Sequence, residues 1–120
     1  MNNETTNEDL ELIRSNMILQ IVLQIIEQDS KVIYAHDRQA LQPLYHMMFD
    51  HTKEAANTVL SGIKREMFKR GVKIESTKRT TKEFTANYLC RGSFGEYRLD
   101  WPTIKEEAAK RMKAYMSNAN

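Results

Sequence analysis

The stretch that decides the fold is MILQIVLQII, residues 17–26, in which only two glutamines interrupt a run of large apolar side chains. Neither Gly nor Pro occurs between residues 10 and 36, so we expect one long helix here, with Asn7 capping its start. Its polar positions form a single narrow stripe at helical spacing: Asn16, Gln20, Gln24 and Glu27. A helix on the surface of a domain needs only one apolar stripe, so this one must be covered on two or three sides.

The covering layer can come from the rest of the chain or from a second copy of it. We expect a homodimer, because 120 residues offer little material to enclose such a helix. The side chains assigned to the dimer interface are the apolar ones in the middle of the helix: Met17, Ile18, Ile21, Val22 and Ile25.

A second helix is expected after a short connection at residues 37–42. Pro43 suits a first helical turn, and Gly71 suits the position just after a last one. Apolar residues between them recur every three or four positions, which predicts a helix antiparallel to the first. Three methionines of this helix are expected in the core, although Met also suits adaptable binding grooves: Met47, Met48 and Met67.

The period then changes from helical to alternating. Residues 72–77 and 83–91 each alternate apolar and polar side chains, which predicts a β-hairpin with a turn near residues 79–81. Cys90 falls on its inner face.

We expect a loop at residues 92–95, with Phe94 either capping the core or exposed for recognition. Residues 96–99 fit a third strand or an early helical turn, and a last helix should span 101–116.

Together these elements predict an α+β fold that is mostly helical. It consists of a long antiparallel helical hairpin, a β-hairpin at one end and a C-terminal helix. Residues 7–116 are expected to form a single domain, since 120 residues supply one core only. The polar ends, residues 1–6 and 117–120, are expected to be disordered and frayed respectively.

Composition limits the class of protein and its compartment. The chain has 41% hydrophobic and 28% charged residues, which is typical of an ordinary soluble domain. Its start has no basic region of the kind that precedes a signal sequence, and residues 17–26 cover only about half of a bilayer core. With one cysteine and no export signal, we expect a cytoplasmic protein that does not enter membranes.

Charge is distributed unevenly along the chain. Residues 1–63 carry a net charge of −5, whereas residues 64–91 carry 9 basic and 3 acidic side chains, a net charge of +6. The basic part covers the end of the second helix and the β-hairpin. It can contact phosphates, meet an acidic protein or simply protect a strand edge. The residues of this expected basic surface are Lys69, Arg70, Lys73, Lys78, Arg79 and Lys82.

No pattern in the sequence predicts catalysis. His46, Asp50 and Glu54 follow one another at helical spacing, but a metal site normally needs three or four converging ligands, and the first helix supplies few. Cys90 has no histidine close to it in the sequence that could activate it as a nucleophile. We expect it to be a small buried side chain. We therefore expect no metal, no cofactor and no enzymatic activity.

Two segments carry a resemblance to a known family. They are KREMFKRGVKI at residues 64–74, and YLCRG followed by GEYRL and Trp101 over residues 88–101. In this order, after a long apolar helix, they resemble small YhjD-like proteins of Gram-positive spore-forming bacteria and their phages. The resemblance implies a cytosolic bacterial or phage accessory protein and brings no catalytic residues with it.

These observations favour a small non-enzymatic regulatory protein that acts by binding another protein, as a homodimer. The alternative is a regulator that binds nucleic acid through the basic surface.

Overall fold

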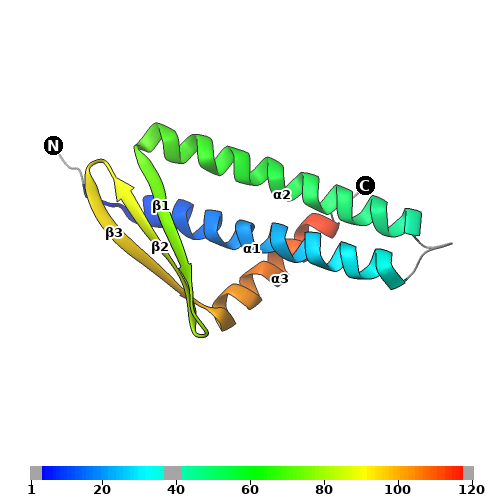
Figure 1. Ribbon diagram of the computed structural model, residues 1–120. Helices are drawn as coiled ribbons and strands as arrows, with labels where there is room; N and C mark the ends of the chain where they lie inside the picture. The colour runs from blue at the N-terminus through cyan, green and yellow to red at the C-terminus, as the bar shows by residue number, and fades with distance from the viewer. Residues whose placement is uncertain (1–3, 37–41, 118–120) are drawn as a thin grey trace.

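Two long antiparallel helices form the body of the molecule, a small sheet packs at one end of them, and a third helix crosses beside them (Figure 1). The computed structural model describes residues 4–36 and 42–117, and the side chains of 4–28 and 47–117. The molecule is elongated, 60 × 32 × 20 Å along its principal axes. The elements, in chain order, are α1 (Asn7–His36), α2 (Gln42–Arg70), β1 (Val72–Arg79), β2 (Glu83–Cys90), β3 (Ser93–Asp100) and α3 (Trp101–Ser117).

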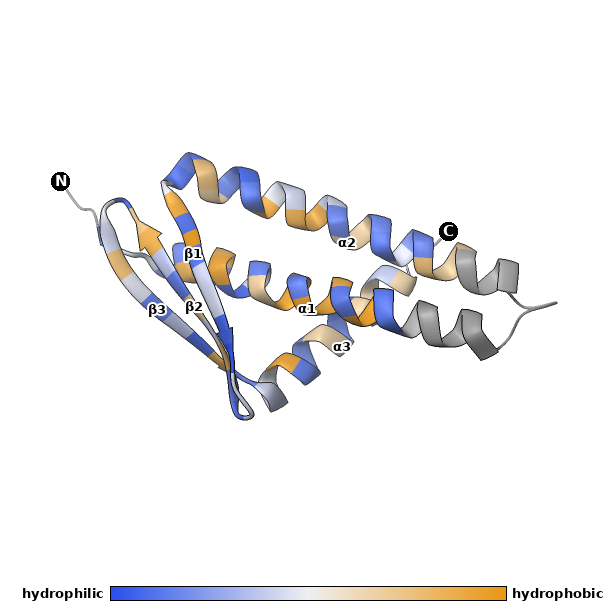
Figure 2. Ribbon diagram, viewed as in Figure 1, coloured by the Kyte–Doolittle hydropathy of each residue, from blue (hydrophilic) through white to orange (hydrophobic). Residues whose placement is uncertain are grey.

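This arrangement confirms the predicted α+β, mostly helical fold. The sheet has three strands in the order β1-β2-β3, both pairs antiparallel, so the expected hairpin is the first part of a larger sheet. Hydropathy follows the same plan, since the apolar side of α1 faces the rest of the molecule in Figure 2.

The start of α1 is held by a reciprocal pair of hydrogen bonds. Thr6 Oγ1 accepts the backbone N–H of Asp9 at 3.1 Å, and Asp9 Oδ2 accepts that of Thr6 at 2.9 Å. This is a capping box, in which two backbone donors of the first turn are satisfied by side chains. The expected cap at Asn7 is therefore wrong by one residue, because Asn7 already lies in the helix.

The N-terminal segment makes defined contacts from residue 4 onward. The Glu4 carbonyl accepts a hydrogen bond from Arg91 Nη2 at 2.7 Å, and Thr6 caps α1. The expectation of disorder over residues 1–6 is wrong for 4–6, while 1–3 lie outside the described residues. At the other end, Ser117 belongs to α3, and 118–120 lie outside the described residues.

The end of α2 and the return into β1 match the sequence prediction. Gly71 has a φ of +70°, and its N–H donates to the Phe68 carbonyl at 3.1 Å, which closes the helix. The expected connection at residues 37–42 lies almost entirely outside the described residues, apart from Gln42 in α2.

The turn between β2 and β3 contains only Arg91 and Gly92, with φ values of +48° and +90°. Positive φ at both positions is the geometry of a type I′ turn, whose twist matches that of the strands it joins. Cys90 therefore pairs directly with Ser93, and the chain continues as a strand to Asp100. The loop predicted for residues 92–95 is wrong after Gly92, and the undecided residues 96–99 are strand.

A close contact in the sheet explains Gly95. It pairs with Tyr88, and a Cβ placed on Gly95 would lie 2.2 Å from Tyr88 Cζ. The Tyr88 ring thus occupies the space that a side chain on β3 would fill.

The core is built from α1, the inner face of the sheet and single faces of α2 and α3. The inner face of β2 is fully used, with Phe84, Ala86, Tyr88 and Cys90 all buried, so the placement of Cys90 is confirmed. Met67 is buried as well, whereas Met47 is 69% exposed, so the expectation that it lies in the core is wrong.

The rest of the chain covers most of the apolar surface of α1. Met17, Ile18 and Val22 have no exposed surface and Ile21 has 7%, all within one chain. Assigning these four residues to a dimer interface is therefore wrong, because α2, α3 and the sheet already enclose them. Ile25, the fifth, stays partly exposed.

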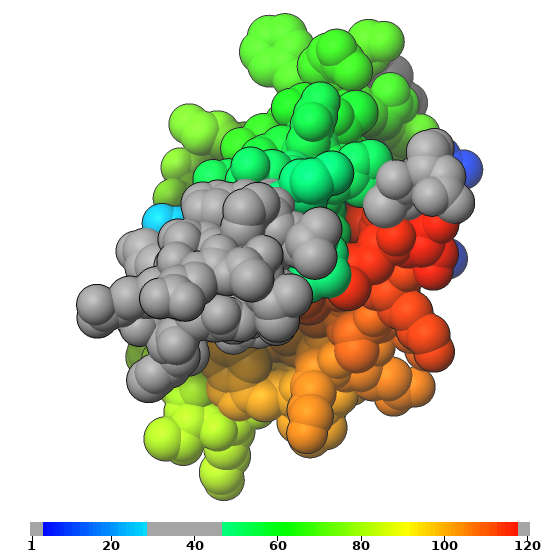
Figure 3. Space-filling model, turned by 90° about the vertical axis from the view of Figure 1, so that its right-hand side faces the viewer, coloured from blue at the N-terminus to red at the C-terminus, as the bar shows by residue number. Residues whose placement is uncertain are grey.

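The junction of sheet and α3 is fixed by capping and stacking. Asp100 Oδ1 accepts the Thr103 N–H at 2.8 Å and caps α3. Trp101 stacks on the buried ring of Phe84 at 6.1 Å between centroids, and its indole N–H donates to the Thr80 carbonyl at 2.8 Å. Seen along the long axis, the start of α3 lies on the side opposite α2, whereas its end lies beside α2 (Figure 3).

Within the described residues, no helix is long and apolar enough to cross a membrane.

Candidate interaction site

An open groove lies where the end of α2 meets the start of β1 and the middle of α1. Its volume is about 720 Å³. Two polar side chains of α1 line it, Asn16 and Gln20, which are the first members of the polar stripe noted in the sequence. The remaining lining residues come from α2 and β1: Lys64, Met67, Phe68, Gly71, Val72, Lys73 and Ile74.

The Asn16 side chain is fully bonded although it is nearly buried. Its amide nitrogen lies 3.6 Å from Met67 Sδ, and its oxygen accepts a hydrogen bond from Gln20 Nε2 at 2.6 Å. The wall of the groove formed by α1 is therefore polar, whereas Met67, Val72 and Ile74 make the other side apolar. Such mixed lining is typical of sites that bind a segment of defined polarity.

Phe68 lies at this groove and is 86% exposed, the most exposed large apolar side chain among the described residues. Two lysines line the same groove, Lys64 and Lys73. An exposed aromatic ring beside cations is a frequent feature of binding hot spots, because the ring gains much by burial in a partner.

The groove continues into the free edge of the sheet. β1 pairs with β2 on one side, and within the described residues no strand pairs with its other side. All residues of β1 from Glu75 to Arg79 are exposed. The backbone groups along this edge are therefore open to solvent or to another chain.

Most residues of the expected basic surface do lie along this side of the molecule. Lys69, at the end of α2, and Lys73, in β1, are exposed near the groove. Lys78, Arg79 and Lys82 are exposed at the far end of β1 and in the following turn. Arg79 lies over the Phe84 ring at 5.1 Å, which fixes its direction while leaving the guanidinium in solvent.

Arg70 does not join this surface, contrary to the sequence prediction. Its guanidinium forms ion pairs with Glu8 at 2.8 Å, Glu66 at 3.1 Å and Asp9 at 3.5 Å. The hydrogen bonds that Arg70 donates to Glu8 and then to Glu66 raise the pKa of Arg70 above its ordinary value. Its charge is therefore used inside the molecule to hold the end of α2 against the start of α1.

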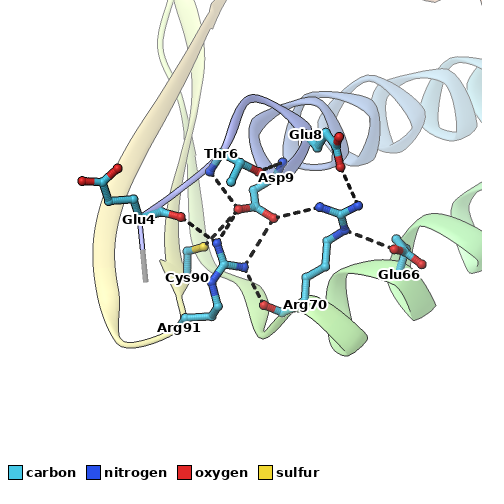
Figure 4. A network of polar contacts seen from close by, with 8 residues as sticks. All are labelled: Glu4, Thr6, Glu8, Asp9, Glu66, Arg70, Cys90 and Arg91. Atoms are coloured by element: carbon cyan, nitrogen blue, oxygen red, sulfur yellow. Dashed lines mark hydrogen bonds and ion pairs between the residues drawn. The ribbon is translucent and has the colours of Figure 1, made fainter. Parts of the chain in front are cut away.

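Asp9 is the centre of this polar network and is fully buried (Figure 4). Its Oδ2 lies 2.6 Å from Arg91 Nη2 and accepts the Thr6 N–H. The hydrogen bond from Arg91 outweighs the cost of burial and holds the pKa of Asp9 well below its usual range. Asp9 is thus a carboxylate at neutral pH, despite its burial.

Arg91 connects three parts of the fold. Besides Asp9, it donates to the Arg70 carbonyl at 2.8 Å and to the Glu4 carbonyl at 2.7 Å. A non-glycine residue with positive φ is strained by about 1 kcal/mol, and these bonds offset that cost. The network therefore holds the start of α1, the end of α2 and the turn between β2 and β3 together.

Two local patterns in the sequence predict parts of this site. The spacing of Thr6 and Asp9 is that of a capping box, and Arg91-Gly92 occupies the two positions of a type I′ turn. No pattern in the sequence predicts that Phe68 is exposed, because the helical period of α2 does not show which part of this helix the sheet covers.

The candidate chemical groups are separate or enclosed. His46 has no described side chain, while Asp50 and Glu54 line a shallow surface depression on α2. Within the described side chains, no three His, Cys, Asp or Glu residues come together as a metal would require. Cys90 is buried with its Sγ 3.7 Å from Asp9 Oδ2, which suits a structural thiol rather than a nucleophile.

A second, strongly apolar groove of about 710 Å³ lies between α1 and α3. Ile25, the one predicted interface residue that keeps exposed surface, lines it together with Ile21. The α3 side contributes Trp101, Pro102, Ile104, Lys105, Ala108, Ala109 and Met112.

A family model described as "YhjD protein" matches residues 4–120, nearly the whole chain. The chain belongs to the YhjD family. This confirms the resemblance drawn from the sequence as far as the family is concerned, and it covers the groove, the polar network and the free strand alike. Searches of curated proteins and of solved structures gave no match to this YhjD-family chain.

Proposed function

We propose that this YhjD-family chain is a small non-enzymatic accessory protein that acts by binding another protein. The observation that carries the proposal is the open groove beside β1, where Phe68 is 86% exposed and next to an unpaired strand edge. Covering this ring with a partner would remove a large apolar surface from water, which favours binding. The proposed setting is the cytoplasm of a Gram-positive spore-forming bacterium, where the protein is encoded by the bacterium or by its phage.

The polar network supports this proposal because it gives the groove fixed walls. Asp9, Arg70 and Arg91 tie the start of α1 to the end of α2 and to the sheet. A preformed groove loses less conformational freedom on binding than a loose one, so more of the contact energy appears as affinity.

The experiment is affinity purification with mass spectrometry from cells that carry the gene, with and without nuclease. Three forms of the chain are compared: the natural protein, Phe68→Ala and Phe94→Ala. Phe94 is 80% exposed on β3, away from the groove, so it is a matched control for loss of an exposed ring. A partner that survives nuclease, depends on Phe68 and ignores Phe94 supports the proposal. Equal recovery with all three forms contradicts it.

A homodimer stays part of the proposal, with a changed interface. The apolar groove between α1 and α3 offers Ile25 and Met112 at its rim, both partly exposed. Two copies could cover these grooves by packing α3 against α3, where the exposed Ala109 permits close approach of helices. Sedimentation at tens of micromolar tests this directly.

A second candidate function is binding to nucleic acid. It is favoured by the exposed cations at the β1–β2 turn, Lys78, Arg79 and Lys82, which project from the helical body (Figure 1). Gel shifts across a salt series test it, because phosphate contacts weaken steeply as salt rises. Charge reversal at Lys78 and Arg79 should then abolish the shift, and absence of binding at low salt removes this candidate.

A further inference from the structure

We propose that β1 accepts an extended acidic segment of a partner protein as a fourth strand of the sheet. Apolar side chains of that segment would enter the groove beside Phe68. The inference rests on the proposed function, since it names the chemistry of the protein that the groove binds.

The free edge of β1 is long enough for this mode of binding. The strand has eight residues, about 26 Å of extended chain. Its last five residues are exposed, and on the side away from β2 no strand covers it within residues 4–36 and 42–117. Strand addition draws its affinity from such main-chain donors and acceptors.

The start of β1 supplies a pocket beside the edge. Val72 and Ile74 line the groove together with Met67 and Phe68. In strand addition, pockets beside the edge select every second side chain of the incoming segment. The apolar wall here selects apolar side chains, and the exposed ring of Phe68 can close over one of them.

The register of the sheet predicts which side chains of the partner should be acidic. Lys73 pairs with Leu89, and Lys78 pairs with Thr85, so both lysines lie on the outer face of the sheet. Val72 pairs with the buried Cys90 and faces inward. A fourth strand therefore meets Lys73 and Lys78 on its outer side and, beside the first half of β1, the apolar Val72 and Ile74 on its inner side, so acidic and apolar residues should alternate along that half.

A second copy of the chain fits this edge poorly. If two β1 strands paired antiparallel about their midpoint, Lys73 of each would lie opposite Lys78 of the other. Like charges directly opposite each other destabilise a strand pair. The bulge between Ile74 and Ser76 adds twist that discourages self-pairing. The same lysines favour an incoming strand of opposite charge.

The first test uses a short labelled peptide in which Glu and Val alternate, with fluorescence anisotropy as the readout. We expect saturable binding at low salt that weakens as salt rises. A peptide of the same composition with the alternation scrambled should bind at least about tenfold more weakly, because its side chains no longer match the two faces. Equal binding of both peptides overturns the proposal.

The second test separates strand addition from simple charge attraction. Backbone N-methylation of alternate residues removes hydrogen-bond donors from one edge of the peptide only. Methylation of one alternate set should abolish binding, and methylation of the other should be tolerated. Hydrogen exchange should slow at those β1 amides that point away from β2. If both methylated peptides bind alike, or no β1 amide is protected, the peptide is not a fourth strand and the proposal fails.

The third test reverses charge on the protein. Lys73→Glu with Lys78→Glu should weaken binding of the Glu–Val peptide at least about tenfold and create binding to a Lys–Val peptide. The control is Lys53→Glu with Lys113→Glu, two exposed helical lysines far from β1 in the sequence, which should leave affinity unchanged. If both double variants lose binding equally, the attraction is not local to β1 and the proposal is overturned.

The results also separate this inference from the proposed function. A Phe68-dependent protein partner that leaves β1 amides unprotected refutes strand addition but keeps protein binding. A β1-dependent dimer seen by sedimentation would show that a second copy takes the edge, and it would overturn the acidic partner.

Discussion

Arg91 Nη2 lies 2.6 Å from Oδ2 of the fully buried Asp9, and this contact joins the turn between β2 and β3 to the first turn of α1. The two residues are 82 positions apart, so the contact closes the fold across most of the chain. Arg91 has positive φ because it is the first residue of the type I′ turn, and the contact with Asp9 holds it in that conformation.

Asp9→Asn should lower the free energy of unfolding by about 2 kcal/mol, since the buried charge that holds Arg91 and Arg70 is lost while the cations remain. Arg91 keeps some contact with water, which limits the cost. Urea unfolding measures the change. Glu8→Gln is the matched control, because Glu8 also pairs with Arg70 but its side chain is 76% exposed, and it should cost less than about 1 kcal/mol. Equal effects of the two changes would contradict the central role of Asp9.

Stability should fall in acid, and Asp9 should account for part of the fall. Arg91 holds the folded-state pKa of Asp9 below its ordinary value of 3.8, so the unfolded chain binds its proton first as pH decreases. The stabilisation is therefore fully present above about pH 5 and is lost progressively below pH 4. Hydrogen bonds from Thr103 lower the pKa of Asp100 and act in the same direction. Urea midpoints between pH 7 and pH 3 should show a smaller slope for Asp9→Asn than for the natural chain.

Gly95→Ala should destabilise the protein by about 1–3 kcal/mol, because the new methyl group would collide with the Tyr88 ring. Gly62→Ala adds the same methyl group but should stabilise the protein. Only Arg65 Nη2 lies near that position, at 4.0 Å, and alanine favours a helix interior by up to about 1 kcal/mol. Thermal unfolding of both variants gives the signs. If Gly95→Ala proves neutral, Tyr88 does not occupy the space above Gly95.

Glutamate at two neighbouring positions of α1 should separate folding from assembly. Ile21 is 7% exposed, so Ile21→Glu buries a charge and should unfold the chain. Ile25 is partly exposed at the groove between α1 and α3, so Ile25→Glu should keep the circular dichroism of the natural chain and yield a monomer in sedimentation. A natural chain that is already monomeric at tens of micromolar would remove the dimer from the proposal.

Much of the fold followed from local sequence. The absence of Gly and Pro over residues 10–36, Gly71 after α2 and the alternation through Cys90 predicted two long helices and the first two strands. For residues 96–99 the sequence did not decide between a third strand and a helical turn, because the preceding turn depends on Arg91 in positive φ, and Asp9 from the other end of the chain binds Arg91 in that conformation. A local sequence pattern does not show such a contact, because the two residues lie far apart in the chain.

The sequence by itself determined that the middle of α1 had to be covered on most sides, since its apolar side chains leave only a narrow polar stripe. Only the tertiary structure decided what covers it, because hydrophobic burial has no direction and is satisfied equally by the same chain or by another. Two helices, α2 and α3, and the sheet close over the apolar side chains of residues 17–22, leaving Ile25, Phe68 and the edge of β1 on the outside. Where the covering elements end depends on packing between segments far apart in the sequence.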